Sequence, residues 1–277
     1  MKRTIRNLSP RSEKSFLASL EPKTPYFDLQ AFLGATKHLG GLKATRELVE
    51  LCGIEQAELV LEVGCGVGKI SLWLGKNYPP EIIALDISQP MLTRARKNLS
   101  QAKLTEKIQL VLADAQALPF QKEIFDLVLC ESVNSFIQDK PEALKEYFRV
   151  LKPGGHLAIN EPIWIKEPSP KLVEYFKKVT GVREILNSGQ WCQLLEQAGF
   201  SSPSVRAYRV RAINQFFYEI QQTGIKDYLS GWARFFLLLF SSPEFRSYLK
   251  TSLPPKEAWR GYFRFLGYGL FIARKEN

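Results

Sequence analysis

Residues 59–77 constrain the fold more than any other stretch of the sequence. Leu59–Val63 is an apolar run of strand length, and Lys69–Asn77 has the apolar spacing of a helix. The five residues between them, 64–68, have the sequence Gly-Cys-Gly-Val-Gly. Glycine permits a positive φ and lets a ligand approach the backbone closely. The segment therefore predicts a buried strand, a tight turn open to a ligand, and a helix.

The same alternation of strand and helix continues through residue 160. Strands are predicted at 81–85, 108–112, 125–130 and 156–160, helices at 43–52, 90–101 and 141–150, and a turn at 152–155. Strands separated by helices imply a parallel sheet with helices on both faces. Two later runs, 205–212 and 262–273, bring the strands to seven. The predicted fold class is α/β: a doubly wound, mostly parallel, Rossmann-like seven-stranded sheet with a helical C-terminal insertion or cap.

Acidic residues stand at the ends of five successive predicted strands. They are Glu62, Asp86, Asp114, Glu131 and Glu161. In open parallel sheets, ligands bind at the carboxyl ends of the strands, near the point where strand order reverses. Asp86 lies 18 residues beyond the last glycine of the turn, where a carboxylate can accept hydrogen bonds from both hydroxyls of a ribose. Together these features predict a nucleoside site, although caps and turns also place acids at strand ends.

The net charge of +10 is concentrated at the two ends of the chain. Residues 1–14 carry five basic groups and one acid, and residues 203–277 carry 12 basic groups and five acids, whereas the middle is nearly neutral. Such an asymmetry fits nucleic acid, an anionic membrane surface or an acidic substrate as the partner. It fits a solvated basic surface equally well.

Cysteine usage and hydropathy exclude several classes of protein. The four cysteines form no C-x-x-C pair, so neither structural zinc nor a disulfide framework is expected, and a reducing cytoplasm is the natural compartment. No cluster of metal ligands stands out, so no bound metal is expected. No apolar run approaches the roughly 20 residues that span a bilayer, and no long apolar stretch follows the basic N-terminus, so a secretory signal peptide is not expected.

Five segments in order resemble the motifs of class I S-adenosylmethionine-dependent methyltransferases. They are LVLEVGCGVGKIS (59–71), ALDIS (84–88), ADAQALPF (113–120), FDLVLCES (125–132) and RVLKPGGHLAINEP (149–162). The chain is most similar to the small-molecule "type 11" group, which includes quinone and sterol methyltransferases. The resemblance covers residues 43–165. It implies an enzyme that uses S-adenosylmethionine and leaves S-adenosylhomocysteine as its product.

The resemblance also implies which residues bind the cofactor. The methionine part is expected beside the first strand and its turn, at Glu62, Gly64, Cys65, Gly66 and Gly68. Asp86 would hold the ribose hydroxyls, and Ile87 would pack on the adenine. Asp114 would accept a hydrogen bond from the adenine amino group, beside the backbone of Ala115.

The remaining implied residues lie near the reacting atoms. Glu131 and Ser132 would lie close to the sulfonium and the methyl acceptor. A sulfonium methyl group is already activated, so the enzyme mainly supplies proximity and orientation. A base is needed only where the acceptor must lose a proton. The candidates for that base are His38, Glu131 and Glu161, and His38 precedes the first core helix, where related enzymes often have a lid.

Four segments are expected along the chain. Residues 1–42 form an N-terminal arm and lid, and residues 43–212 form the cofactor-binding core, with an insert at 163–189. Residues 213–261 form an aromatic-rich helical cap, and residues 262–277 form the last core strand and a tail. The cap is expected to cover the acceptor pocket, to pack as a helical core, or to make peripheral contact with a membrane.

A small organic molecule is the expected methyl acceptor. Residues 131–134 (Glu-Ser-Val-Asn) lack the Asn/Asp-Pro-Pro-aromatic turn typical of enzymes that methylate nucleobase amino groups, and Cys130 is predicted to be a buried strand end. Nucleic acid is therefore not favoured as a partner, and no obligate protein partner is implied. Three alternatives stay open: an RNA methyltransferase that uses the basic C-terminal region, a catalytically silent cofactor-binding protein, and an oxidoreductase, which would need the longer G-x-G-x-x-G spacing.

Overall fold

A single seven-stranded sheet organises the protein. The structure is a computed structural model, and it describes residues 38–210, 225–252 and 264–276. The strands are β1 (Leu59–Val63), β2 (Glu81–Asp86), β3 (Ile108–Leu112), β4 (Phe125–Glu131), β5 (Leu151–Trp164), β6 (Ser201–Arg209) and β7 (Leu266–Arg274). Most of the predicted arm 1–42 and part of the predicted cap lie outside the described residues.

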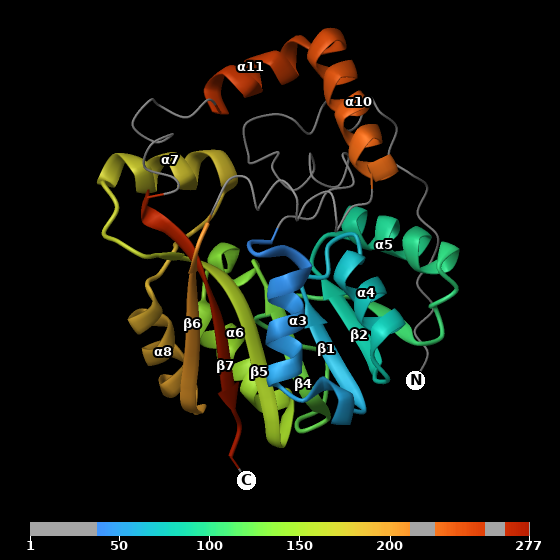
Figure 1. The fold of residues 1–277 in the computed structure, drawn as a ribbon, viewed down its shortest axis with the longest axis vertical. Coiled ribbons are helices and arrows are strands. Elements are labelled where there is room, and N and C mark those ends of the chain that lie inside the picture. The colour runs from blue at the N-terminus through green and yellow to red at the C-terminus, as the bar shows by residue number, and fades with distance from the viewer. Residues whose placement is uncertain (1–37, 211–224, 253–263, 277) are drawn as a thin grey trace.

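The strand order of the sheet is β3-β2-β1-β4-β5-β7-β6 (Figure 1). Strands β1 to β5 pair in parallel, and β7 runs antiparallel between β5 and β6. The strand order reverses between β1 and β4, where the chain leaves for β2 on one side and returns to β4 on the other. Ligands bind at such a switch point, outside the carboxyl ends of the strands. The predicted α/β sheet of seven strands is thus confirmed.

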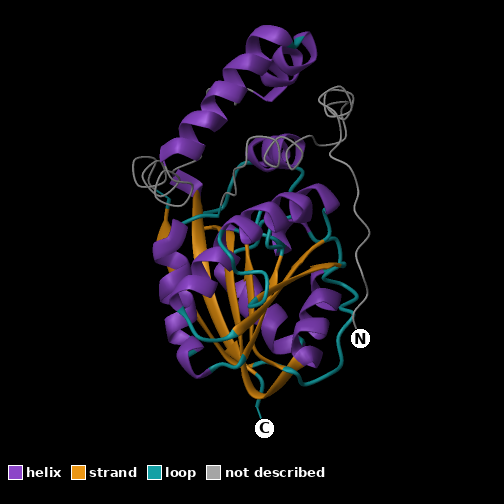
Figure 2. Cartoon of the chain, turned by 90° about the vertical axis from the view of Figure 1, so that its right-hand side faces the viewer, coloured by secondary structure: helices purple, strands orange, loops and turns teal. Residues whose placement is uncertain are grey.

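Helices cover both faces of the sheet (Figure 2). They are α3 (Gly41–Leu51), α4 (Lys69–Asn77), α5 (Gln89–Gln101), α6 (Lys140–Val150), α7 (Pro170–Thr180), α8 (Ser188–Gln197), α10 (Ile225–Ser241) and α11 (Pro243–Ser252), with short 3-10 turns at Ile54–Gln56 and Asn134–Phe136. The helices α10 and α11 lie between β6 and β7 in the chain, so the predicted helical insertion is confirmed.

Alternate residues of the central strands pack on opposite helical layers. In β1, Val60 joins the core formed with α3, α4 and α5, whereas Leu61 and Val63 join the core formed with α6 and α8. In β4, Leu127 packs in the core with α3, α4 and α5, and Val128 packs in the core with α6 and α8. Side chains alternate between the two faces of a strand, and both faces are covered here. This explains why the strands are continuous apolar runs in the sequence.

Several predicted boundaries are correct, and their local causes are visible. Strands β1 and β3 and helix α4 have the predicted bounds. Helix α5 begins where the Ser88 hydroxyl accepts a hydrogen bond from the Met91 amide at 3.4 Å, and Pro90 stands in its first turn. A serine cap followed by proline is a strong start signal because both satisfy the requirements of the first helical turn.

The predictions for the C-terminal half of the sheet need correction. The turn expected at 152–155 is a bulge inside β5: from Phe125 to Leu127 β4 advances two residues, while β5 advances five, from Leu151 to His156. Strand β5 also continues beyond residue 160, because Trp164 still pairs with β7. Strand β6 begins at Ser201 rather than 205, and β7 begins at Leu266 rather than 262. Most residues of the edge strand β6 are exposed, so no apolar run marks its start.

Candidate active site

A cavity of about 470 Å³ lies at the carboxyl ends of β1, β2 and β4 and beside the loop that follows β3. Four of the five predicted acids line it: Glu62, Asp86, Asp114 and Glu131. Because these strands are neighbours in the sheet, four carboxyl groups that are far apart in the sequence surround one space. The volume is within the range of pockets that hold a small ligand or cofactor.

The turn after β1 forms one wall of the cavity and needs its glycines. Gly64 and Gly66 have φ angles of 73° and 54°, a region that favours glycine. A Cβ atom on Gly64 would lie 2.1 Å from Val133 Cγ2, so a side chain there would collide with the loop after β4. Gly64, Cys65 and Gly66 line the cavity. Gly68 is not among the lining residues; it is the N-cap of α4, with a φ of 75°.

Asp86 is held in place by the backbone on both sides of it. Its Oδ2 accepts a hydrogen bond from the Gly66 amide and its Oδ1 from the Ser88 amide, each at 2.8 Å. Burial raises the pKa of this carboxyl, and the backbone hydrogen bonds oppose that effect. Each carboxylate oxygen has two lone pairs, so an oriented Asp86 can accept further hydrogen bonds from a ligand. Ile87 beside it is 69% exposed and offers the cavity an apolar surface.

Glu62 is the most deeply buried of the lining acids. Its Oε2 accepts a hydrogen bond from the Ser71 hydroxyl on α4 at 2.5 Å. Burial raises the pKa of the Glu62 carboxyl to about 8, with a smaller contribution from the negative charges of Glu131 and Asp86. Transfer of a carboxylate out of water disfavours its charged form. A cationic ligand in the cavity would restore that charged form, so Glu62 is suited to a positively charged group.

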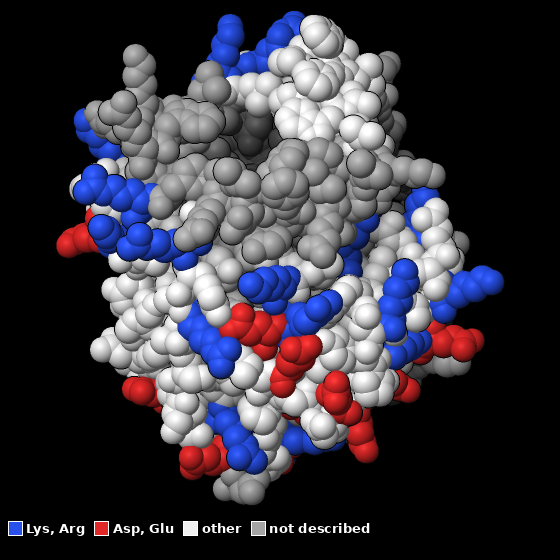
Figure 3. Space-filling view, in the orientation of Figure 1, with Lys and Arg blue, Asp and Glu red and all other residues white. Residues whose placement is uncertain are grey.

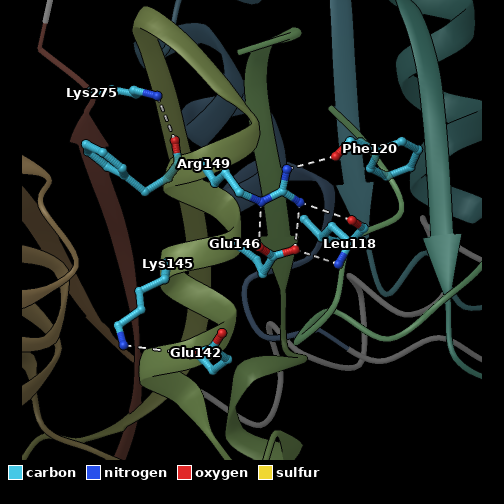
Figure 4. A network of polar contacts seen from close by, with 8 residues as sticks. Leu118, Phe120, Glu142, Lys145, Glu146, Arg149 and Lys275 are labelled. Atoms are coloured by element: carbon cyan, nitrogen blue, oxygen red, sulfur yellow. Dashed lines mark hydrogen bonds and ion pairs between the residues drawn. The ribbon is translucent and has the colours of Figure 1, made fainter. Parts of the chain in front are cut away.

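Asp114 lies on the loop that follows β3, and α6 anchors this loop (Figure 4). Arg149 donates hydrogen bonds to the carbonyls of Phe120 and Leu118 at 2.8 and 3.0 Å, while Glu146 accepts one from the Leu118 amide at 2.7 Å. Arg149 and Glu146 also form an ion pair with each other. The loop is thereby fixed with Asp114 and Ala115 at the cavity.

Glu131 belongs to a buried polar cluster with His38, Thr45 and Asn160. Its Oε2 accepts hydrogen bonds from Asn160 Nδ2 at 3.0 Å and from the Thr45 hydroxyl at 3.2 Å. His38 Nε2 lies 3.1 Å from that hydroxyl and 3.7 Å from Glu131 Oε2. Among the described residues, the buried Glu131 Oε1 and Ser132 Oγ have no hydrogen-bond partner. Because buried polar atoms normally have a hydrogen-bond partner, both atoms are suited to form hydrogen bonds with polar groups of a ligand.

Glu161 has a different environment from the other four acids. It does not line the cavity, and it is fully buried. Its carboxylate accepts hydrogen bonds from the backbone amides of Val133, Asn134 and Ser135 at 2.7 to 3.2 Å, and from the Ser135 hydroxyl at 2.6 Å. Both oxygens are therefore engaged in holding the loop that follows β4. This placement favours a structural role over the catalytic role expected from its position after a strand.

The cavity also has lining residues that the sequence analysis did not single out. Phe136 and Gln138 come from the loop after β4, and Arg183 comes from the segment after α7. The Arg183 amide donates to the Ser135 carbonyl at 2.8 Å, which connects that segment to the loop. No local pattern marks these residues, because their positions depend on how two distant segments pack. Across the described part of the chain, no group of three or more His, Cys, Asp or Glu side chains is arranged to hold a metal ion.

Comparison with known proteins identifies the family. Residues 61–159 match the model of a family described as a methyltransferase domain. An uncharacterised protein from Haemophilus influenzae is 33% identical over 174 residues, which cover 61% of this chain and 69% of that protein. The chain belongs to the class I S-adenosylmethionine-dependent methyltransferases. The matched region, 61–159, runs from β1 to β5 and contains four of the five acids at the strand ends, Glu62, Asp86, Asp114 and Glu131.

Two further relatives extend the comparison. Phosphoethanolamine N-methyltransferase 3 from Arabidopsis thaliana is 29% identical to this methyltransferase over 162 residues, which cover 58% of the chain but only about a third (32%) of the plant enzyme. The crystal structure of a phosphoethanolamine N-methyltransferase from Haemonchus contortus, in complex with phosphomonomethylethanolamine and S-adenosylhomocysteine, superposes with a TM-score of 0.71 at 16% identity, over 95% of this chain and 59% of that one. At that identity the likeness shows the fold.

The cavity of this methyltransferase fits its cofactor, S-adenosylmethionine. Gly64 and Gly66 line the cavity without side chains, and the buried Glu131 Oε1 and Ser132 Oγ are polar atoms without a partner in the described structure. Four carboxyl groups line the same space, and the cofactor carries a positive charge and several hydrogen-bond donors. Together with the comparisons, this fit confirms the expected enzyme class and cofactor. No helix of the described segments is long and apolar enough to cross a membrane.

Proposed function

We propose that the cavity binds S-adenosylmethionine and a small organic acceptor, to which the enzyme transfers the methyl group. The observation that carries the proposal is the placement of Glu62, Asp86, Asp114 and Glu131 around one cavity at the switch point of the sheet. The chain would hold the acceptor in line with the methyl group of the bound cofactor, so that transfer proceeds by in-line displacement.

The residues expected to bind the cofactor would each contact one part of it. Asp86, oriented by two backbone amides, accepts hydrogen bonds from the ribose hydroxyls. Ile87 and Asp114 line the cavity. Ile87 would pack on the adenine, and Asp114 would accept a hydrogen bond from its amino group. The glycine turn and Glu62 lie along the methionine part. The ionised form of Glu62 is stabilised there by the positive charge of the ligand.

When bound, the cofactor supplies an activated methyl group on a sulfonium. The chain contributes orientation, exclusion of water and, for an acceptor with an N–H or O–H group, a place for the departing proton. Glu131 is the candidate base, because its Oε2 is held by Thr45 and Asn160 while Oε1 has no partner among the described residues. His38, which also lines the cavity, is the alternative base.

A methyl-transfer assay with the variant Glu131→Gln tests this assignment. Labelled S-adenosylmethionine is supplied with a panel of small amines and alcohols, and phosphoethanolamine, the substrate named for the plant relative, is the first probe. We expect Glu131→Gln to lower kcat by roughly 100-fold or more for an acceptor that loses a proton, with little change in cofactor affinity. A variant with unchanged kcat across the pH profile would assign the proton to another group, and the matched variant His38→Gln then identifies it.

A further inference from the structure

Helix α10 has a large apolar face that is exposed to solvent. Its exposed apolar side chains, with their exposed fractions, are Leu229 (61%), Trp232 (44%), Phe236 (48%), Leu237 (55%) and Phe240 (79%). At 100° per residue these positions occupy an arc of roughly 140° on one side of the helix. Single exposed apolar residues are ordinary, whereas a contiguous apolar patch marks an interaction surface.

The opposite side of α10 is apolar as well and is already packed. Leu238 is buried, and the ring of Phe235 lies edge-on to that of Phe245 on α11, with 5.4 Å between their centroids. A helix on the surface of a soluble protein usually presents polar residues to water and apolar ones to its core. Helix α10 presents apolar residues in both directions, so its exposed face is suited to an apolar environment.

Basic residues stand on α11, the helix that follows this exposed face in the chain. Arg246 and Lys250 are exposed on α11, and Arg246 donates hydrogen bonds to the carbonyls of Leu239 and Phe240 at the end of α10. Figure 3 shows Lys and Arg side chains at the upper edge of the molecule, beside the white surface in the area of α10. Residues 225–252, which form the two helices, carry four basic residues and two acids. Basic residues are complementary to anionic headgroups, and each nearby cation strengthens such binding.

The dimensions of α10 decide how it can meet a bilayer. Its 17 residues extend about 25 Å, which is less than a membrane's hydrocarbon core of about 30 Å. A helix with aromatic and leucine side chains on one face, and basic residues nearby, instead lies flat at the boundary between headgroups and acyl chains.

We propose that the exposed face of α10, with the cations of α11, docks the enzyme on an anionic lipid bilayer. Both helices lie beyond the carboxyl edge of the parallel strands, the edge that carries the cavity (Figure 1). Docking therefore holds the cavity end of the sheet toward the lipid surface.

Vesicle co-sedimentation of the full chain tests this proposal. We use vesicles of phosphatidylcholine mixed with phosphatidylglycerol and, for comparison, of phosphatidylcholine alone. The wild-type protein is expected to sediment with the anionic vesicles, more weakly at high salt, and not with the neutral ones. Leu229→Glu and Phe240→Glu change the two most exposed positions and are each expected to reduce partitioning by about tenfold.

The matched control is Leu51→Glu, which changes another exposed leucine at the end of α3 and is expected to partition like the wild type. Cofactor titration without vesicles must be unchanged in all three variants, which keeps this test separate from the proposed function. The proposal is overturned if the wild type does not bind anionic vesicles or binds both kinds of vesicle equally. It is overturned as well if Leu51→Glu reduces partitioning onto the vesicles as much as Phe240→Glu does. It is also overturned if analytical ultracentrifugation shows a dimer that Phe240→Glu dissociates, because a second copy would then occupy the face.

Discussion

At the scale of single residues, the five acids at the strand ends have different environments and therefore different chemistry. The Asp86 carboxylate is oriented by two backbone amides, and Glu131 is held through one oxygen while the other has no described partner. Glu62 is deeply buried with a raised pKa, and Glu161 is engaged through both oxygens. The position in the sequence predicts where these acids gather, whereas the local hydrogen bonds decide what each can do.

The raised pKa of Glu62 makes stability depend on pH. In the unfolded chain this carboxyl loses its proton near 4.5, whereas in the folded protein it keeps the proton until about pH 8. Between these values the folded state binds more protons, so the free energy of unfolding falls as pH rises, by up to about 1.4 kcal/mol per pH unit from this group. We expect denaturant unfolding of Glu62→Gln to lack this decline, because the amide does not titrate.

The comparison with the wild type isolates the Glu62 contribution from those of other titrating groups. Asp86 and Glu161 also have raised pKa values and remain in both proteins. The difference between the two unfolding curves must therefore change across pH 4.5 to 8. Curves that stay parallel over that window would show that Glu62 ionises normally in the folded protein.

At the scale of elements, the loop that follows β4 connects the site to the neighbouring strand. Glu161 in β5 accepts hydrogen bonds from three consecutive backbone amides of this loop, from Val133 to Ser135. The loop in turn contacts the glycine turn, where Val133 occupies the space that a Cβ on Gly64 would need. The arrangement of two walls of the cavity thus depends on one buried carboxyl group that does not line it.

Replacement of Glu161 separates its structural role from a catalytic one. Glu161→Ala leaves three loop amides without an acceptor, and each buried unsatisfied group costs about 1–3 kcal/mol. We expect a loss of about 3 kcal/mol or more in the free energy of unfolding by denaturant, and a smaller loss for Glu161→Gln, which keeps an acceptor oxygen. Two variants as stable as the wild type but equally inactive in methyl transfer would instead indicate a catalytic carboxyl.

The burial of each element explains how well its position could be predicted from the sequence. Strands β1, β2 and β4 are largely buried, and they and the edge strand β3 are apolar runs in the sequence; the bounds of all four are predicted to within one residue. The start of β6 is not, because its exposed residues leave no apolar signal. The four acids and the glycines 64 and 66 that line the cavity follow the strands directly, so their place at this end of the sheet is predictable from the sequence. Arg183 and Gln138 were missed because only tertiary packing brings their segments to the cavity.

At the scale of the whole molecule, the order of the strands creates the site. Placing β1 between β2 and β4 brings residues from 62 to 131 to one edge of the sheet. The antiparallel β7 joins the end of the chain to this core, and α10 and α11 extend beyond the same edge (Figure 1). We therefore propose cofactor binding at the switch point and membrane docking by the insertion, two functions that variants can separate.

Isothermal titration with S-adenosylmethionine tests the central claim most directly. The wild type is compared with Asp86→Ala and with the control Asp126→Ala. Asp126 also accepts hydrogen bonds from two backbone amides, those of Glu58 and Leu59. It lies at the start of β4, at the end of the strands opposite to the cavity. We predict that Asp86→Ala weakens binding by on the order of 100-fold or more, from the loss of two charge-assisted hydrogen bonds, and that Asp126→Ala binds normally. Equal binding by all three folded proteins would contradict the placement of the cofactor at this site.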